Sequence, residues 1–408
     1  MLIGTQFYSP LLSILLFVLF VSLFWLGVYV FNRRYILSNS SGYEYFPRLS
    51  VVVPAYNESG RIGNLLDSLM QARYPRKKLE IIVVNDGSTD ETASVVKKYP
   101  VKLISHGKNQ GKIDALNAGV KAAKGEIVVT LDSDVEVLPH TLTMLVQKFK
   151  DKRIGAVAGS YKAKKMHSKN NIFSYLLEKL QSIEYSSFAL IRKQQEIFGS
   201  ILVVPGAIAA YRRSALQAVG YFDNDTIIED YDMTIKLHKA GYKIASERSA
   251  LAYVVAPQKL ASLIRERMRW YRGGLQVMKK HSDVFMGKLG VVSALWIIES
   301  ISIVLQFILL YIISLEIYAK LATMSVIDIL SIFSLQSLFD PIVIVAFALF
   351  FTGLANTIFS LRFLEEGGVK ILLYPLMAVY TSVLLYVFTK ALVQEIRGTD
   401  PKWIKAEI

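Results

Sequence analysis

The sequence has no cysteine among its 408 residues and only five histidines. The absence of cysteine excludes disulfide bonds, thiolate metal sites and cysteine nucleophiles. The few scattered histidines argue against a histidine-rich metal site. Acidic residues are also scarce relative to basic ones: 33 Asp and Glu stand against 47 Lys and Arg, a formal net charge of +14. This excess predicts an anionic partner, such as nucleic acid, lipid headgroups or a phosphorylated substrate.

Apolar residues, in contrast, are abundant. They make up 53% of the chain, and the mean hydropathy is +0.37. Such a chain is too apolar for an ordinary soluble protein, yet its 20% of charged residues is too many for a membrane bundle alone. We therefore expect a soluble domain combined with membrane spans.

The first long apolar run covers residues 11–31 and contains no charge. It is long enough to cross a bilayer, and it lacks the basic start and small-residue cleavage site of a signal peptide. We predict an N-terminal transmembrane helix within residues 1–34. Because Arg33 and Arg34 follow the run directly, the positive-inside rule places the N-terminus outside and the next domain in the cytoplasm.

The C-terminal region 291–396 contains three more span candidates, at 291–318, 341–361 and 371–394. Residues 322–338 are also apolar but are interrupted by Asp328 and several serines. This segment fits a fifth span, a re-entrant piece or an interfacial helix.

The number of spans decides the side of the C-terminal tail, residues 397–408. Four spans place the tail outside and five place it inside. Arg397, Lys402 and Lys405 favour the inside. The bias is small, and the sequence leaves both possibilities open.

Residues 45–256 have a different pattern, in which short β-branched runs alternate with amphipathic segments. The expected strands are 49–57, 79–87, 101–106 and 125–134, and the expected helices between them are 61–72, 89–99 and 112–123. This alternation predicts an α/β domain with a mainly parallel sheet covered on both faces. Ligands of such sheets bind at the carboxyl ends of the strands, where Asn57, Asp86, Asp132 and Asp134 fall.

The stretch VVTLDSDVEVLP (128–139) places Asp132 and Asp134 one residue apart after an apolar strand. Like charges this close raise each other's pKa unless a cation lies beside them. A polar strand-ending turn and a metal site both fit the pattern. If a nucleotide diphosphate binds here, Mg²⁺ or Mn²⁺ between it and the carboxylates would remove the repulsion.

Two further strand ends carry polar motifs. In NDGSTD (85–90), Asp86 can offer a carboxylate to a heterocycle or ribose, although Ser88 or Asp90 can also act as a helix N-cap. In KNQGKIDALNAG (108–119), Lys112 lies at a helix start that suits an anion, although a solvated surface lysine is an equal alternative.

The stretch TIIEDYD (226–232) supplies Glu229, Asp230 and Asp232 before a helical segment. One of these carboxylates could accept the proton of an attacking hydroxyl. Favourable interaction with the helix dipole explains Asp230 or Asp232, but not the whole cluster.

Residues 257–290 are predicted to form amphipathic interfacial helices. The apolar side chains of PQKLASLIRERMRWYRGG share one face, from which the arginines largely diverge, as in a membrane-surface helix. The pair Arg269 and Trp270 also suits a diphosphate and a sugar ring, respectively.

Together these motifs resemble the processive, membrane-embedded family 2 glycosyltransferases. That group includes poly-N-acetylglucosamine, hyaluronan, chitin-oligosaccharide and cellulose synthases. The matching stretches, in order, are PAYNE (54–58), NDGSTD (85–90), GKIDALNAG (111–119), DSD (132–134), PGAIAAYRRSAL (205–216), EDYD (229–232) and RERMRW (265–270). The resemblance runs from about residue 49 through the last span and is greatest to bacterial poly-N-acetylglucosamine synthases.

The resemblance implies a GT-A fold, a Rossmann-like nucleotide-sugar domain inserted between transmembrane helices. It also implies site roles. By the resemblance, Asp134 would hold the metal, Asp230 would be the catalytic base with Glu229 beside it, and Trp270 and Gly206 would contact the acceptor. The residues expected to contact the nucleotide-sugar are Ala55, Tyr56, Glu58, Asp86, Lys112, Asp132, Ser133 and Arg269. Two positions depart from the family, which usually has Gln where Glu266 stands and Thr where Ile228 stands.

The function expected from the resemblance is inverting, processive transfer of a hexosyl unit from UDP-GlcNAc or a related UDP-sugar to a growing polysaccharide. Passage of the polymer across the cell membrane is expected to be coupled to this transfer, with Glu299 as a candidate polar group of the channel. The alternative is a single transfer to a polyprenyl phosphate, which keeps the nucleotide site. We expect no nucleic-acid partner, because no aromatic residues interleave the basic residues of the sheet and the strand-end carboxylates would repel phosphates unless a metal is present.

Overall fold

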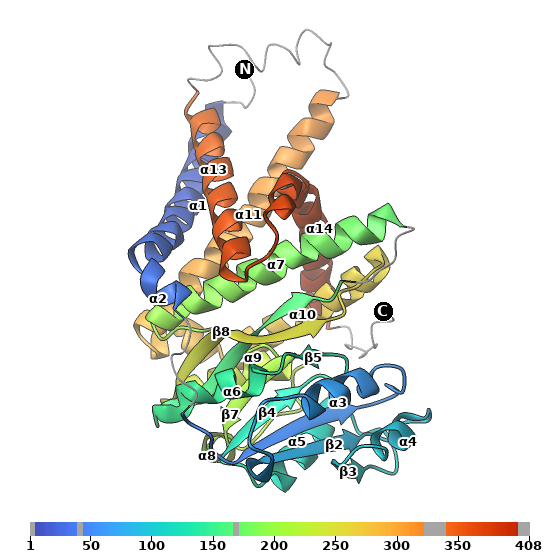
Figure 1. Ribbon diagram of the computed structural model, residues 1–408. Helices are drawn as coiled ribbons and strands as arrows, with labels where there is room; N and C mark the ends of the chain where they lie inside the picture. Colours follow the sequence, from blue (N-terminus) through green and yellow to red (C-terminus); the bar gives the residue numbers. More distant parts are fainter. Residues whose placement is uncertain (1–4, 39–43, 166–170, 322–339, 399–408) are drawn as a thin grey trace.

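The computed structural model describes residues 5–38, 44–165, 171–321 and 340–398. An α/β domain forms one end of the molecule, and the long apolar helices extend from one side of it (Figure 1). A further long helix, α7 (Ile172–Ile197), lies between the two parts.

The domain is built on one eight-stranded sheet with the order β3-β2-β1-β4-β7-β6-β8-β5. Its first half is parallel and corresponds to the four strands expected from the sequence, β1 (Leu49–Ala55), β2 (Leu79–Asn85), β3 (Lys102–Ser105) and β4 (Ile127–Leu131). Every residue of β1 and β4 is buried, as expected for parallel strands covered on both faces.

The second half of the sheet is mixed. Strand β7 (Ile208–Arg212) runs antiparallel to both β4 and β6 (Ile154–Ala163). Strand β8 (Lys243–Val254) is parallel to β6, and the short β5 (Glu136–Val137) is antiparallel to β8. The mainly parallel sheet expected from the sequence is therefore found at β1–β4, and the direction reverses at β7.

Helices cover both faces of the sheet. They are α3 (Ile62–Met70), α4 (Thr92–Val96), α5 (Lys112–Ala122), α6 (Thr141–Gln147), α8 (Arg213–Ala218) and α9 (Glu229–Lys239), with short 3₁₀ turns at Arg76–Lys78 and Lys148–Lys150. Successive residues of a strand point to opposite faces, so Val51 packs in the core beneath α3 while Val52 packs in the core beneath α5. These two cores hold the carboxyl ends of β1, β2 and β4 level with one another.

Helix α7 is not anticipated by the sequence reading. It has 26 residues, and many of its buried side chains are polar or charged, including Gln181, Glu184, Arg192 and Gln195. The domain and the apolar helices supply partners to these polar side chains, so the buried face of α7 combines polar and apolar residues.

The domain continues into α10 (Leu260–Lys280) and a π-helical turn (Val284–Lys288) before the C-terminal apolar helices. Those helices are α11 (Val291–Leu321), α13 (Pro341–Phe363) and α14 (Leu376–Ile396), with a 3₁₀ segment Gly368–Leu373 before α14; at the N-terminus lie α1 (Thr5–Phe31) and the short α2 (Arg33–Leu37). Four stretches are long and apolar enough to cross a membrane: Ser9–Phe31, Val291–Leu309, Pro341–Phe363 and Leu376–Ile396. The possible span at 322–338 lies outside the described residues.

Helix α14 begins beside the middle of α13, not beside its end. Just before α14, the Tyr374 hydroxyl donates a hydrogen bond to the Phe350 carbonyl, near the middle of α13. At its other end, Glu395 pairs with Arg272 of α10. The end of α14 therefore lies on the same side as the α/β domain, beside α10 (Figure 1).

Candidate active site

The carboxyl ends of β1, β2 and β4 open into one cleft, whose space together with the part open to solvent is about 1100 Å³. Nine of the residues assigned to the site from the sequence line it: Ala55, Tyr56, Glu58, Asp86, Lys112, Asp132, Ser133, Asp134 and Arg269. A smaller adjoining cavity, with room for about one water molecule, is lined by Gly206, Glu229 and Asp230. Lys112 and Asp132 line both spaces, so the two groups of residues form one continuous site.

Lys112 is the central cation where the two spaces meet. Its Nζ lies 2.7 Å from Asp132 Oδ1 and 2.8 Å from Glu229 Oε1. These two carboxylates raise the pKa of Lys112 against the opposing effect of its burial. Lys112 also lowers the pKa of Asp132 even though burial acts to raise it. Lys112 is therefore a permanent cation at the start of α5, and not the solvated surface lysine of the alternative reading.

Asp134 has the opposite environment. Burial and the charges of Asp132 and Glu58 raise its pKa to about 6, and Arg61 offsets this only partly. In the described part of the chain, no cation lies within ion-pair distance of the Asp134 carboxylate. A carboxylate that lies among like charges at a cleft offers oxygen ligands of the kind that a hard divalent cation prefers. Of the two DSD carboxylates, Asp132 is neutralised by the protein and Asp134 is left for a ligand.

Asp86 holds the loop that leads into α5. Its Oδ1 accepts hydrogen bonds from Gln110 N at 3.0 Å and lies 2.7 Å from His106 Nδ1, and its Oδ2 accepts one from Gly111 N at 2.8 Å. The turn after Asp86 requires Gly87, because its φ is +68°. A Cβ there would also lie 2.4 Å from the backbone of Lys108, in the loop that leads into α5. Asp86 thus lines the cleft and also positions Lys112.

Asp230 lies at the first turn of α9 and lines the cavity that adjoins the cleft. Gly206 N donates to its Oδ2 at 2.8 Å, and Tyr231 N donates to its Oδ1 at 2.8 Å. Burial and the neighbouring Glu229 charge raise its pKa to about 6, although both N–H groups and Lys112 favour the ionised form. A carboxylate poised near neutrality in a cavity that adjoins a cleft has the properties of a general base.

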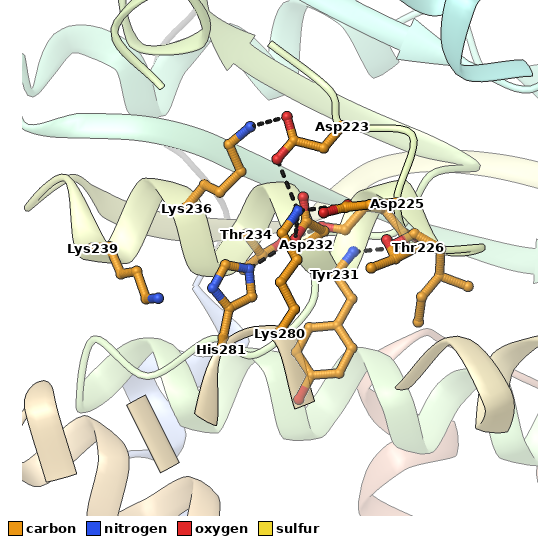
Figure 2. Close-up of polar contacts among 12 residues, drawn as sticks. Asp223, Asp225, Thr226, Tyr231, Asp232, Thr234, Lys236, Lys239, Lys280 and His281 are labelled. Carbon is orange, nitrogen blue, oxygen red and sulfur yellow. Dashed lines mark hydrogen bonds and ion pairs between the residues drawn. The ribbon is translucent and has the colours of Figure 1, made fainter. Parts of the chain in front are cut away.

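The third carboxylate of EDYD points elsewhere. Asp232 belongs to a cluster with Asp223 and Asp225, whose ligand atoms lie within 4.8 Å of one another (Figure 2). Lys280 Nζ lies among them, at 2.8 Å from Asp223, 2.7 Å from Asp225 and 2.9 Å from Asp232. His281 Nε2 is 2.8 Å from the same Asp232 oxygen. Because Lys280 already supplies the positive charge, this cluster ties α9 to the end of α10, and Asp232 is not part of the cleft.

Helix α10 presents its two motif residues to different surroundings. Arg269 lines the cleft, whereas Trp270 is not among the residues that line the cleft or its adjoining cavity. The ring of Trp270 instead covers the guanidinium of Arg267, 3.9 Å from the ring centroid. Arg267 is 1% exposed and is held by Glu184 of α7 and by the Tyr380 hydroxyl of α14, 3.5 Å from Nη2. Whether Trp270 contacts an acceptor stays a prediction.

Four residues with charged or amide side chains line the cleft without having been assigned to the site from the sequence: Arg61, Asn109, Arg265 and Glu266. Arg61 follows the PAYNE stretch (54–58) and Asn109 lies within KNQGKIDALNAG (108–119), so proximity to these motifs was the available signal. Glu266 was noted only as a departure from the family. Burial raises the pKa of its carboxyl group, although Arg267 beside it acts in the opposite direction.

Comparisons with known proteins agree with this geometry. Residues 50–220 match the family described as Glycosyl transferase family 2. The poly-beta-1,6-N-acetyl-D-glucosamine synthase of Staphylococcus epidermidis is 32% identical over 280 residues, which cover 65% of this chain and 65% of that protein. The enzyme of the same name from Staphylococcus aureus strain MSSA476 is 32% identical over 288 residues, 67% of this chain and 66% of that protein. The matched region thus spans about 65% of the length of these relatives.

Among solved structures, a mannosyltransferase from Pyrobaculum calidifontis in complex with GDP-Man and Mn²⁺ is similar to the whole chain. The TM-score is 0.66 at 21% identity, with 96% of this chain and 100% of that chain covered. This likeness extends the shared fold beyond the α/β domain. The expected GT-A fold and the expected resemblance to family 2 glycosyltransferases are confirmed.

Proposed function

Because the chain carries a family 2 glycosyl transferase domain, we propose that the protein transfers a hexosyl unit from a UDP-sugar to a growing polysaccharide. UDP-GlcNAc is the donor that we put first, since the curated relatives are named poly-beta-1,6-N-acetyl-D-glucosamine synthases. The observation that carries the proposal is the continuous site in which Lys112 joins a nucleotide-sized cleft to the cavity of Asp230.

In this proposal the chemistry is a single inverting displacement. Asp230 accepts the proton of an acceptor hydroxyl, whose oxygen forms a bond to the anomeric carbon as the bond from that carbon to the diphosphate breaks. UDP leaves with its negative charge stabilised by Lys112 and Arg269. Gly206, the proposed acceptor contact, lies beside both carboxylates, since a Cβ there would be in ordinary contact with Asp230 Oδ2 at 3.4 Å and Glu229 Oε1 at 3.5 Å.

Asp134 would hold a divalent cation, Mg²⁺ or Mn²⁺. The carboxylate fits such an ion because it is buried among like charges with no cationic partner in the described residues. When bound, the cation supplies charge neutralisation for the diphosphate. The similarly folded mannosyltransferase was solved with Mn²⁺ and GDP-Man, which supports the same class of ligand here.

We further propose that the protein is a multi-pass protein of the cell membrane with its domain in the cytoplasm. Arg33 and Arg34 lie directly after α1 at the domain side, where the positive-inside rule expects cationic residues. UDP-sugars are cytoplasmic metabolites in this scheme, and the acceptor is a glycan that leaves through the membrane helices. Glu299 of α11 remains a candidate polar group on that path.

The proposal is tested with the full-length protein in lipid nanodiscs, supplied with radiolabelled UDP-GlcNAc and MnCl₂. We expect labelled polymer that stays in the aqueous phase and elutes at high mass, and no product in EDTA. Other UDP-sugars tested in parallel define the donor. Label that extracts into organic solvent would instead indicate a single transfer to a polyprenyl phosphate, and no label transfer from any UDP-sugar would overturn the proposal.

A further inference from the structure

The proposed base is held by a connecting segment that itself contacts a membrane helix. Residues 200–206, here called the 200–206 segment, join α7 to β7, and the Gly206 N–H at its end donates to Asp230. The segment has no regular secondary structure before the turn at Gly206, so its course depends on the side chains around it.

Helix α9 holds the middle of the segment. His238 Nε2 lies 2.8 Å from the Ile201 carbonyl oxygen, and Val204 N donates to Thr234 Oγ1 at 3.0 Å. The Thr234 hydroxyl in turn donates to the backbone carbonyl of Asp230 at 2.7 Å. The segment and the helix that carries the proposed base are therefore joined along their length.

Helix α11 holds the start of the segment from the membrane side. The indole Nε1–H of Trp296 donates to the Ser200 carbonyl at 2.8 Å. Trp296 is fully buried, and its ring packs edge-on against His238 with centroids 5.3 Å apart. Within the same cluster it meets Tyr231, the residue that follows the proposed base.

A second link from α11 runs through α7. Gln195 Nε2 donates to Glu299 Oε2 at 2.8 Å, and Gln195 Oε1 accepts from Leu202 N at 3.4 Å. One amide side chain thus joins the membrane helix to the segment. Glu299 and Trp296 lie three residues apart in the sequence of α11, so both links leave the same side of that helix.

From these contacts we infer that Trp296 and Glu299 are positioning residues, which hold the 200–206 segment so that Gly206 N–H meets the Asp230 carboxylate. The inference rests on the proposed role of Asp230. Neither residue touches Asp230 in the contacts described, and both act through the segment. The first of the C-terminal apolar helices, α11, would thereby influence the pKa of the base, and not only anchor the domain.

The expected signature is a change in the pH dependence of turnover. Gly206 N–H favours the ionised form of Asp230, so losing this bond should raise the pKa of Asp230 further. The other charged or titratable groups facing Asp230 are Glu229 on its own helix, Lys112 on α5, Arg192 on α7 and Tyr211 on β7. None of these is altered by a substitution in α11.

The test uses Trp296→Phe in the full-length protein, because phenylalanine keeps an aromatic ring and removes the N–H donor. With UDP-GlcNAc and Mn²⁺, we expect kcat to fall about 10- to 100-fold and the acidic limb of its pH profile to move to higher pH. Binding of UDP, measured by calorimetry, should stay within a few-fold of wild type. Wild-type kcat and an unmoved acidic limb in a folded Trp296→Phe protein would overturn the inference.

A matched control is Trp25→Phe in α1. Trp25 is also buried, its ring also packs near the end of α7 at 6.1 Å from Phe198, and its indole N–H has no hydrogen bond among the described residues. We expect Trp25→Phe to leave the pH profile in place. An equal shift in both variants would indicate general loosening of the helices and would contradict the inference.

A second pair of variants serves if Trp296→Phe does not fold. Glu299→Gln keeps an oxygen that can accept from Gln195, and Glu299→Leu does not. Glu299→Leu should therefore lose more turnover than Glu299→Gln and should shift the acidic limb in the same direction. Equal behaviour of the two variants would overturn the inference, whereas an inactive wild-type protein in the same assay would instead contradict the proposed function.

Discussion

At the scale of single residues, the site separates carboxylates that look alike in the sequence. Asp132 and Asp134 are one residue apart, yet only Asp132 has Lys112 beside it. Asp230 and Asp232 are equally close, yet Asp230 faces the cavity while Asp232 pairs with Lys280 and His281. The chemistry of each carboxylate follows from which cation reaches it.

The metal assignment predicts the behaviour of Asp134→Asn. This substitution should lower turnover by at least about 100-fold, since the cation that offsets the diphosphate charge loses its protein ligand. The protein should remain folded, because Asn removes a charge that the fold does not pair. Turnover is measured against Mn²⁺ concentration, with Asp151→Asn at an exposed turn as the control. Full activity of Asp134→Asn, or of the wild type in EDTA, would contradict the assignment.

The base assignment predicts that Asp230→Asn lowers kcat by about 10²- to 10⁴-fold with little change in UDP binding. Asn keeps the shape of the side chain and removes its ability to accept a proton. The rate of product formation gives kcat, and calorimetry with UDP gives the affinity for the nucleotide, so the two effects are measured separately. A collapse of UDP affinity would instead make Asp230 a nucleotide or metal ligand.

The same variant should change stability with a defined sign. The pKa of Asp230 is raised in the folded protein from its ordinary value of 3.8 to about 6. Protonated Asp230 therefore contributes to the free energy of unfolding. This contribution is fully present below about pH 4 and is lost as the pH rises through 6. Thermal unfolding without nucleotide should therefore show Asp230→Asn more stable than wild type at pH 8, by about 1–2 kcal/mol after allowance for solvent screening. The two proteins should differ little at pH 4, and an equal difference at both pH values would contradict the assigned pKa.

At the scale of elements, α10 connects the cleft to the helices above the domain. Arg269 lines the cleft, and Arg267 two residues earlier is buried between α7 and α14. The ring of Trp270 covers Arg267 and also lies 6.4 Å from Phe188 of α7. A cation–π contact with a desolvated guanidinium holds such a ring in place.

We predict that Trp270→Ala stops the formation of long polymer while UDP binding stays within a few-fold of wild type. The indole is expected to hold the terminal acceptor sugar, and its loss leaves the nucleotide contacts intact. Product length on gels is the measurement, with Trp270→Phe as the variant that keeps a ring over Arg267. If Trp270 only anchors α10, the variant should integrate poorly and any surviving protein should make polymer of normal length. Normal integration with normal polymer would remove the main reason to prefer a synthase to a lipid-phosphate transferase.

At the scale of the whole molecule, the apolar helices share one side of the domain, with α7 between them and the sheet (Figure 1). The described end of the chain lies near the domain, because Glu395 at the end of α14 reaches Arg272. Because α14 begins beside the middle of α13 and ends at the domain, we do not count it as a complete crossing, and we expect the C-terminal tail on the cytoplasmic side, as its basic residues favour.

The absence of cysteine makes this topology directly testable. Single cysteines introduced as Ser9→Cys and Gly398→Cys can be labelled with a maleimide that does not cross membranes. In intact cells we expect labelling of Ser9→Cys alone, and labelling of Gly398→Cys only after permeabilisation. Lys288→Cys, next to the domain, should behave like Gly398→Cys. Labelling of Gly398→Cys from outside would contradict the proposed side of the tail.

The sequence by itself determined the parallel half of the sheet, four apolar helices long enough to cross a membrane, and the residues that meet at the strand ends. These depend on local signals: β-branched runs, helical periodicity, long uncharged stretches and turn motifs such as DSD and NDGSTD. It could not anticipate α7, because the buried face of this helix combines apolar side chains with polar ones whose partners are distant in the chain. Without the family resemblance, the motif alone did not distinguish Asp230 from Asp232, and the sequence could not link Glu299 to the segment beside Asp230. Each of these features depends on side chains from elements that are distant in the sequence. The pKa and orientation of a carboxylate follow from its neighbours in space, and only the tertiary structure determines those neighbours.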